Sequence, residues 1–345
     1  MAEPANAPRP LAISLGDPAG IGPELIAESW ARREELALPP FFTVHGREVL
    51  LAAAQARGFE IAVEPIASPD HAARVFPHAL PVLGERDGAY RPGEPDREGA
   101  ALALASLEDA TMLAVSGSAS GVVTAPIAKG RLAEVGFTRP GQTEFVSALS
   151  GAPADKGVMM LAGPSLRVVP LSVHVALRDV VSSLSTELIV ARGEVVADAL
   201  RRDFGIAQPR LAVTGLNPHA GEGGRFGDEE ATIIEPAIAR LRDAGVDASG
   251  PFAADGLFSP PMLASFDAAL CMYHDQALIP FKALAFEDGV NVTLGLPVVR
   301  TSPDHGTAFA IAGKRQASAM PTIAAIRMAG EIARRRASIH THRSS

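Results

Sequence analysis

Three of the nine histidines follow short apolar runs that are typical of buried parallel strands. His174 ends SLRVVPLSVH, His219 ends RLAVTGLNPH, and His274 lies in DAALCMYHD. Because open α/β sheets bind ligands beyond the carboxyl ends of their strands, three imidazoles at three such ends could meet at one point. Neutral imidazoles suit zinc and similar divalent metals, and three protein ligands leave one coordination position open for catalysis.

The pattern is compatible with a catalytic metal site, in which the neighbouring Asp275 would be a partner of His274 or an additional ligand. A histidine at a strand end is more often a hydrogen-bonded loop residue than a metal ligand, so spacing alone favours that second interpretation. The sequence contains no HExxH motif that would decide between the two.

A group of anion-binding residue types follows the last of these histidines. Lys282, Asn291 and Arg300 place an amide between two fixed cations in a chain of net charge −8. Arginine and lysine are common ligands of phosphate and carboxylate groups. These residues predict either an anion pocket or surface salt bridges, and the closeness of His274 in the sequence favours the pocket.

Two glycine-rich segments precede predicted helices. GDPAGIGPE (16–24) follows a strand, but it is not the GxGxxG fingerprint, and no Walker GxxxxGK[ST] motif occurs. GEGGRFGDEE (221–230) could present backbone N–H groups to an anion or form a loop capped by acids. Generic motifs therefore identify no nucleotide cofactor.

The elements that would position these side chains alternate along the chain. Strands are expected within residues 11–20, 121–130, 165–174, 210–219 and 267–275. Helices are expected over 185–205, between a Ser185 N-cap and Gly205, and over 228–245, which opens with acidic residues. This alternation predicts an α/β fold of the doubly wound type.

Length and composition exclude several other classes of protein. A chain of 345 residues exceeds the roughly 250–300 residues of one core, so two packed units are expected. Hydrophobic residues make up 47% and charged residues 20%, which excludes a disordered chain, and the negative net charge argues against binding of nucleic acid. The single cysteine, Cys271, can form no internal disulfide. Because no segment reads as a signal peptide or membrane span, we expect a cytoplasmic protein without a membrane partner.

Eight segments, taken in order, resemble the 4-hydroxythreonine-4-phosphate dehydrogenase family, NAD-dependent enzymes of pyridoxal phosphate synthesis. They are GDPAGIGPE (16–24), VVTAPIAKG (122–130), PGQTEF (140–145), LSVH (171–174), GLNPHAGEGGRFGDEE (215–230), MYHDQALIPFK (272–282), GVNVTLGLPVVRTSPDHGTA (289–308) and AGK (312–314). The resemblance implies a fold of the isocitrate and isopropylmalate dehydrogenase type, with two α/β/α domains and a central cleft. Residues 1–138 plus 312–345 would form the first domain, and residues 139–311 the second, which would carry the metal ligands and dimer contacts.

The resemblance also implies a role for individual residues. The ligands of a divalent metal, which would be Zn, Mg, Co or Mn, would be His174, His219 and His274. The substrate-binding residues would be Gln142, Thr143, Lys282, Asn291 and Arg300. NAD or NADP would be contacted by His305, Gly306, Thr307 and Ala308. No residue is implied as the base that takes the alcohol proton.

The implied reaction is the oxidation of 4-phosphohydroxy-L-threonine to 2-amino-3-oxo-4-phosphooxybutanoate, which decarboxylates to 3-amino-2-oxopropyl phosphate, in a homodimer whose active site is shared between subunits. One position departs from the family, which has PGHTEF where this chain has Gln142. Glutamine can donate a hydrogen bond but carries no positive charge. The alternative is a related dehydrogenase of a four-carbon sugar-acid phosphate such as D-erythronate 4-phosphate. A non-catalytic binding protein would be expected to lack a ligand or a cation, and none is missing.

Overall fold

The computed structural model describes the backbone of residues 8–153 and 156–343 and the side chains up to residue 339. The chain forms two compact units. Unit 1 takes the chain up to Gly157 and again from Leu296 onward, and unit 2 spans Val158–Gly295. Both units mix helices with strands, so the predicted α/β class is confirmed.

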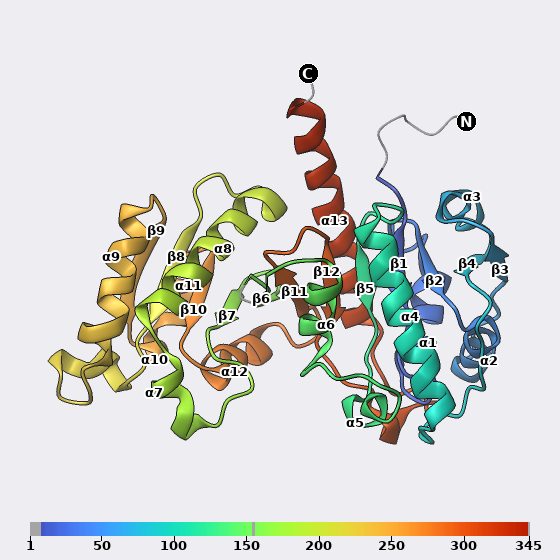
Figure 1. Cartoon of the computed structure of the whole chain (residues 1–345), viewed down its shortest axis with the longest axis horizontal. Coiled ribbons are helices and arrows are strands. Elements are labelled where there is room, and N and C mark those ends of the chain that lie inside the picture. Colours follow the sequence, from blue (N-terminus) through green and yellow to red (C-terminus); the bar gives the residue numbers. More distant parts are fainter. Residues whose placement is uncertain (1–7, 154–155, 344–345) are drawn as a thin grey trace. The chain divides into compact units, whose positions relative to one another are not determined.

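Unit 1 has a parallel sheet with the strand order β3-β4-β2-β1-β5-β12. These strands are β1 (Leu11–Ser14), β2 (Phe41–Val44), β3 (Val63–Ile66), β4 (Leu80–Leu83), β5 (Val122–Thr124) and β12 (Arg300–Pro303). The helices are α1 (Gly22–Ala31), α2 (Arg47–Arg57), α3 (Ala72–Val75), α4 (Arg97–Val115), α5 (Lys129–Ala133), α6 (Gln142–Leu149) and α13 (Met320–Arg343), with short 3-10 turns at Pro69–His71 and Phe309–Ile311. Helix α4 packs on β1 and β2, and α13 packs on β12 (Figure 1).

Helix α4 packs on the sheet of unit 1. Its start is capped by Asp96, whose Oδ1 accepts a hydrogen bond of 2.7 Å from the Gly99 N–H. Small side chains on its buried face, including Ala100, Ala103 and Ala110, let the helix lie close to the sheet. The small residues of α4 therefore allow a closely packed core between this helix and the sheet of unit 1.

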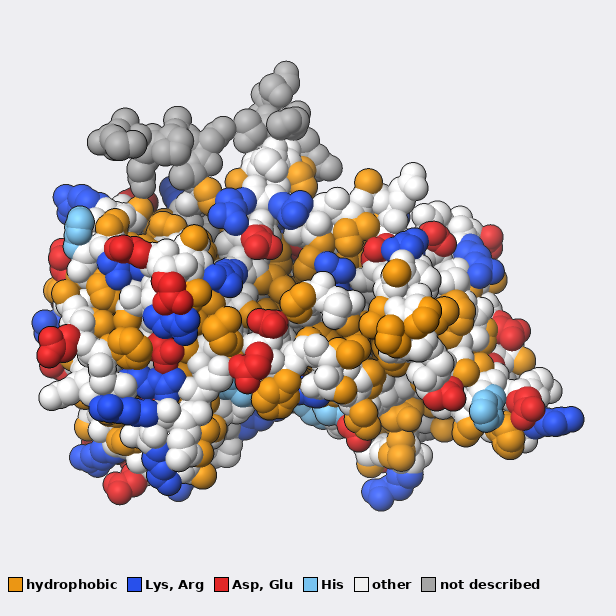
Figure 2. Space-filling view, turned by 180° about the vertical axis from the view of Figure 1, so that it is seen from behind, with side chains coloured by type: hydrophobic (Ala, Val, Ile, Leu, Met, Phe, Trp, Pro, Cys, Tyr) orange, Lys and Arg blue, Asp and Glu red, His pale blue; other side chains and the backbone are white. Residues whose placement is uncertain are grey.

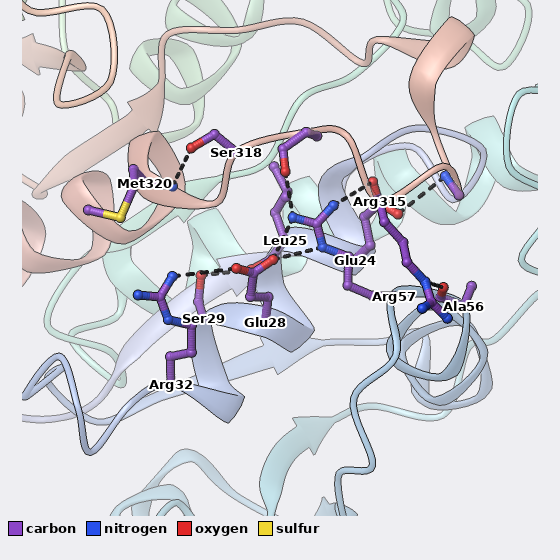
Figure 3. Close-up of polar contacts among 12 residues, drawn as sticks. Glu24, Leu25, Glu28, Ser29, Arg32, Ala56, Arg57, Arg315, Ser318 and Met320 are labelled. Carbon is purple, nitrogen blue, oxygen red and sulfur yellow. Dashed lines mark hydrogen bonds and ion pairs between the residues drawn. The ribbon is translucent and has the colours of Figure 1, made fainter.

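A buried ionic cluster ties α1 and α2 of unit 1 to the segment that follows residue 312 (Figure 3). Arg57, at the end of α2, lies between the carboxylates of Glu24 and Glu28, and its Nε lies 2.7 Å from Glu28 Oε2. Glu24 Oε2 also accepts a hydrogen bond of 3.2 Å from the Gly313 N–H. Arg57 Nη2 donates to the Ala317 carbonyl, so one guanidinium holds three parts of the chain together.

Unit 2 has a mixed sheet with the strand order β11-β6-β7-β10-β8-β9. The β11–β6 and β6–β7 pairs are antiparallel, and the other three pairs are parallel. Its strands are β6 (Val158–Ala162), β7 (Arg167–Pro170), β8 (Arg210–Thr214), β9 (Asp247–Phe252), β10 (Ala268–Cys271) and β11 (Val290–Leu294). Its helices are α7 (Val180–Ser183), α8 (Thr186–Phe204), α9 (Glu235–Asp243), α10 (Ala254–Leu257), α11 (Pro260–Leu263) and α12 (His274–Leu284), with 3-10 turns at Leu177–Asp179 and Pro218–Gly223 and a π-helical turn at Glu230–Ile234.

The predicted elements are confirmed, with one local difference. Each of the five predicted strand segments contains a strand, namely β1, β5, β7, β8 and β10. Ser185 caps α8, since its Oγ accepts a hydrogen bond of 3.1 Å from the Leu188 N–H, and Gly205 ends the helix in the left-handed region at φ +71°. The predicted helix over 228–245 begins with the π-helical turn and continues as α9.

The compact units differ in extent from the predicted domains 1–138 plus 312–345 and 139–311. Helix α6 packs on α4, and β12 pairs with β5, so residues 139–157 and 296–311 lie in unit 1. Residues 1–7, 154–155 and 344–345 of the predicted domains lie outside the described residues.

The surface carries charges of both signs. On the face drawn in Figure 2, lysine and arginine side chains are interspersed with aspartate and glutamate side chains. Within the described part of the chain, no helix has both the length and the apolar character that a membrane span requires.

Candidate active site

The three predicted metal ligands follow three neighbouring parallel strands of unit 2. Strand β10 lies between β7 and β8 and is parallel to both. His174 follows the end of β7, His219 follows the end of β8, and His274 follows the end of β10. The structure therefore places all three histidines at the carboxyl edge of one sheet, as the strand-end argument requires.

All three histidines are accessible to solvent, but the groups around them differ. His174 and His219 are exposed. His219 has a backbone φ of +53°, and its ring centroid lies 6.4 Å from that of Phe226. His274 begins α12, and its Nδ1 lies 2.7 Å from Asp275 Oδ1. That contact leaves Nε2 of His274 as the free ring nitrogen for a metal.

The loop that carries His219 is held by a buried carboxylate. Oε1 of Glu230 accepts hydrogen bonds of 2.8 Å from the N–H groups of Leu216 and Asn217. Burial acts to raise the pKa of Glu230, but the hydrogen bonds from Asn217 and Leu216 outweigh it and lower the pKa below its usual value. From the sequence, Glu230 was expected only as one of the acidic residues at the start of a helix; its position in GEGGRFGDEE, close to a candidate ligand, was the available signal.

The donor chemistry of the three histidines fits a divalent metal, since all are imidazoles and one is oriented by a carboxylate. In the described part of the chain, no three His, Cys, Asp or Glu side chains come close enough together to bind one ion. The structure thus brings the three loops to one edge but does not bring the rings together. Their role as metal ligands stays a prediction.

The two predicted substrate-binding residues of unit 2 are Lys282, on α12, and Asn291, on β11. Lys282, in the last turn of α12, is half-buried, and its Nζ lies 5.5 Å from the centroid of the Phe286 ring. Asn291, in β11, is also half-buried, and its Oδ1 is covered and has no hydrogen-bond partner among the described residues. A buried amide oxygen in that state is a candidate acceptor for a ligand.

In unit 1 the structure brings Arg300 and Thr143 together although they are 157 residues apart. Arg300 is 3% exposed, and it donates hydrogen bonds of 3.4 Å to Thr143 Oγ1 and 2.8 Å to Thr124 Oγ1. Burial lowers the pKa of Arg300 to about 10, against an opposing effect of the Glu144 carboxylate. The guanidinium therefore stays charged at neutral pH and is held in a fixed position. Thr124 was not among the predicted site residues, although it lies in the predicted strand segment 121–130 and ends β5.

Gln142, the residue that departs from the family pattern, begins α6. Its Nε2 donates a hydrogen bond of 3.1 Å to the backbone carbonyl of Ala125, at the end of β5. This bond fixes the start of α6 against the strand. A neutral donor is sufficient for that role.

The predicted nucleotide-binding residues lie against the first glycine-rich segment. The Ile21 N–H donates a hydrogen bond of 3.0 Å to the Thr307 carbonyl. A Cβ on Gly20 would lie 2.9 Å from that carbonyl oxygen, so only glycine allows this approach. His305 Nδ1 lies 3.1 Å from the Gly306 carbonyl oxygen. The GDPAGIGPE and DHGTA segments, far apart in the sequence, are therefore in direct contact within unit 1.

Comparison with known proteins is consistent across the whole chain. Residues 38–329 match the family model described as "Pyridoxal phosphate biosynthetic protein PdxA". The 4-hydroxythreonine-4-phosphate dehydrogenase of Erythrobacter litoralis is 62% identical over 329 residues, covering 95% of this chain and 98% of the relative, and that of Zymomonas mobilis is 50% identical over 95% of this chain and 97% of the relative. The crystal structure of 4-hydroxythreonine-4-phosphate dehydrogenase from Klebsiella pneumoniae matches with a TM-score of 0.84 and 36% identity, over 96% of this chain and all of that one. This chain belongs to the PdxA family of pyridoxal phosphate biosynthetic proteins.

Proposed function

We propose that this protein is an NAD-dependent 4-hydroxythreonine-4-phosphate dehydrogenase that oxidises the C3 alcohol of 4-phosphohydroxy-L-threonine. NAD, when bound, would accept the hydride and the alcohol proton would be released; the resulting β-keto acid would then lose carbon dioxide and take up a proton to leave 3-amino-2-oxopropyl phosphate. The observation that carries this proposal is the buried Arg300 guanidinium, which is held by Thr124 and Thr143 in a chain of this family. A fixed and desolvated cation is suited to hold an anionic substrate.

The chain's own residues would bind and orient the substrate. Arg300, Thr143 and Gln142 come from unit 1, while Lys282 and Asn291 come from unit 2. Cations and amide groups at fixed positions would hold the phosphate and carboxylate so that the C3 hydrogen faces the nicotinamide. Positioning of this kind can lower a barrier by several kcal/mol, with about 7–11 kcal/mol as its upper range.

His174, His219 and His274 would hold a divalent metal, which when bound acts as a Lewis acid on the alcohol oxygen and on the ketone formed from it. Asp275 accepts a hydrogen bond from Nδ1 of His274 and so keeps Nε2 available as the donor atom. Glu230 keeps the His219 loop in place through the backbone of Leu216 and Asn217. Residues 305–308 would contact NAD or NADP, beside Gly20 and Ile21.

We also propose that the enzyme is a cytoplasmic homodimer, in which residues 139–311 supply the dimer contacts and each subunit contributes to its partner's site. Unit 2 exposes large apolar side chains on and after α12, with 68% of Ile279, 48% of Leu284 and 68% of Phe286 accessible. Large exposed apolar side chains are typical of a surface that another protein covers. Light scattering of the purified protein and of a Phe286→Glu variant checks this, since a monomeric wild type would contradict it.

The proposed reaction is tested by NADH formation with metal-reconstituted protein and 4-phosphohydroxy-L-threonine. A parallel assay with D-erythronate 4-phosphate and a third assay with a chelator are the controls. We expect metal-dependent turnover with the hydroxythreonine phosphate alone. Turnover only with the sugar-acid phosphate would transfer the proposal to that alternative substrate, and turnover with neither would contradict both.

Gln142→His is expected to keep kcat/KM within about threefold of the wild type, while Gln142→Leu lowers it by about tenfold. The reason is that a neutral donor to the Ala125 carbonyl can come from an amide or from an imidazole, and a net hydrogen bond contributes about 0.5–1.5 kcal/mol. Steady-state kinetics of the two variants provide the measurement. A large gain in activity with histidine would show instead that a titratable group belongs at this position.

A further inference from the structure

We propose that Lys129 is a substrate-binding residue, which holds the phosphate of the substrate together with Arg300, Thr143 and the first N–H groups of α6. Lys129 begins α5, in the VVTAPIAKG segment, and its side chain is exposed. The inference rests on the proposed function, because it names the anion that this part of unit 1 would bind.

The geometry brings Lys129 to the start of α6. The Lys129 Nζ lies 3.4 Å from the point that a Cβ at Gly141 would occupy, and Gly141 is the N-cap residue of α6. A glycine cap has no side chain that could accept from the first N–H groups of the helix, and the structure shows no such side-chain bond from Gly141. The start of α6 therefore has polar backbone groups beside an ammonium group.

A second cation, Arg300, also lies near the first turn of α6. Nη1 of Arg300 lies 3.4 Å from the hydroxyl of Thr143, which is the second residue of α6. Arg300 is 3% exposed, and burying a cation is costly unless charged or polar partners compensate for the lost water. The nearby Arg131 is a different case, since it pairs with Glu134 at 3.0 Å. Lys129 and Arg300 are thus two cations that lie near this helix start.

The carboxylate of Glu144 also lies at the start of α6, near Lys129. Glu144 Oε2 lies 2.9 Å from the same Cβ point at Gly141, so the carboxylate folds back over the first turn of α6. A carboxylate at a helix start is favoured by the backbone N–H groups, as a phosphate would be. The position of Glu144 shows that this place accepts an anion, and it also means that Glu144 would compete with a bound phosphate.

The experiment compares Lys129→Gln with Glu144→Gln and with Lys156→Gln, a matched control that removes the charge of another exposed lysine of unit 1. Calorimetric titration with inorganic phosphate gives an affinity that does not depend on turnover. Steady-state kinetics with 4-phosphohydroxy-L-threonine separate KM from kcat, and thermal unfolding checks each fold.

We expect Lys129→Gln to weaken phosphate binding and raise KM by about ten- to a hundredfold with a much smaller change in kcat. Glu144→Gln should strengthen phosphate binding severalfold, because it removes the competing charge, and Lys156→Gln should match the wild type. Lys129→Arg should recover part of the affinity.

Unchanged phosphate affinity and KM in Lys129→Gln would overturn the inference, as would a wild type that binds no phosphate. If Lys129 only forms a surface pair with Glu144, both glutamine variants would lower the unfolding temperature alike and leave phosphate binding unchanged. If the wild type binds phosphate through Lys129 but oxidises neither substrate, the phosphate site stands and the proposed reaction fails.

Discussion

We expect His219→Ala to lower kcat by more than about a hundredfold, while the protein keeps its fold. Changes to partners of metal ligands typically cost 10–100-fold in metal affinity or activity, so loss of a ligand itself should cost more. His219 is exposed, so its removal should change the free energy of unfolding by no more than about 0.5 kcal/mol. Bound metal, measured by elemental analysis, and kcat at increasing metal concentration are the two readouts.

Two further variants make this prediction specific. Asp275→Asn should fall between His219→Ala and the wild type, because it removes only the carboxylate beside His274. His78→Ala removes an exposed histidine of unit 1 that follows none of the three histidine-bearing strands, and it should behave as the wild type. Full activity of His219→Ala in chelator-treated buffer would show that the histidines are ordinary loop residues.

Arg57→Met is expected to lower the free energy of unfolding by roughly 3–5 kcal/mol, because it leaves the buried Glu24 carboxylate without its cation and removes the closer of the two cations beside Glu28. The side chains of Glu24, Glu28 and Arg57 are 0%, 12% and 7% exposed. Urea unfolding followed by the fluorescence of Trp30, the only tryptophan in the chain, reports on unit 1 directly. The Ala317 carbonyl also loses its hydrogen bond from Arg57, so the segment after residue 312 is held less firmly and NADH binding should weaken too.

The loss of stability in Arg57→Met should also depend on pH. Burial raises the pKa of Glu24, while Arg57 acts to lower it, so the variant raises this pKa further. Folded Arg57→Met then holds a proton on Glu24 at pH values where the unfolded chain does not, and its stability falls as the pH rises through that window. The deficit should be smaller at mildly acidic pH than at alkaline pH.

Arg32→Met is the control for this pair of measurements. Arg32 is 30% exposed and reaches Glu28 at 3.5 Å from the solvent side, and exposed pairs contribute about 0–1 kcal/mol. An equal loss in the two variants, or a loss in Arg57→Met that does not change with pH, would contradict the assignment of Arg57 as the cation of a buried cluster.

Features that depend on neighbouring residues could be read from the sequence. The strands before the three histidines, the Ser185 cap and the Gly205 stop of α8 were all predictable, because burial, capping and left-handed backbone act within a few residues. The strand-end rule also placed His174, His219 and His274 at one kind of position. The sequence by itself determined which residue types stand at the ends of which strands.

Only the tertiary structure decided which of these residues meet. The order β7-β10-β8 puts the three histidine strands side by side, and no local pattern encodes that order. Arg300 reaches Thr143 because β12 pairs with β5 in unit 1. Lys129, at the start of α5, lies beside the start of α6 only because the folded chain brings these two segments together. The Arg57 cluster likewise joins α1, α2 and the segment after residue 312. These contacts depend on chain segments far apart in sequence, and their energies come from burial and charge pairing that exist only once the sheet has formed.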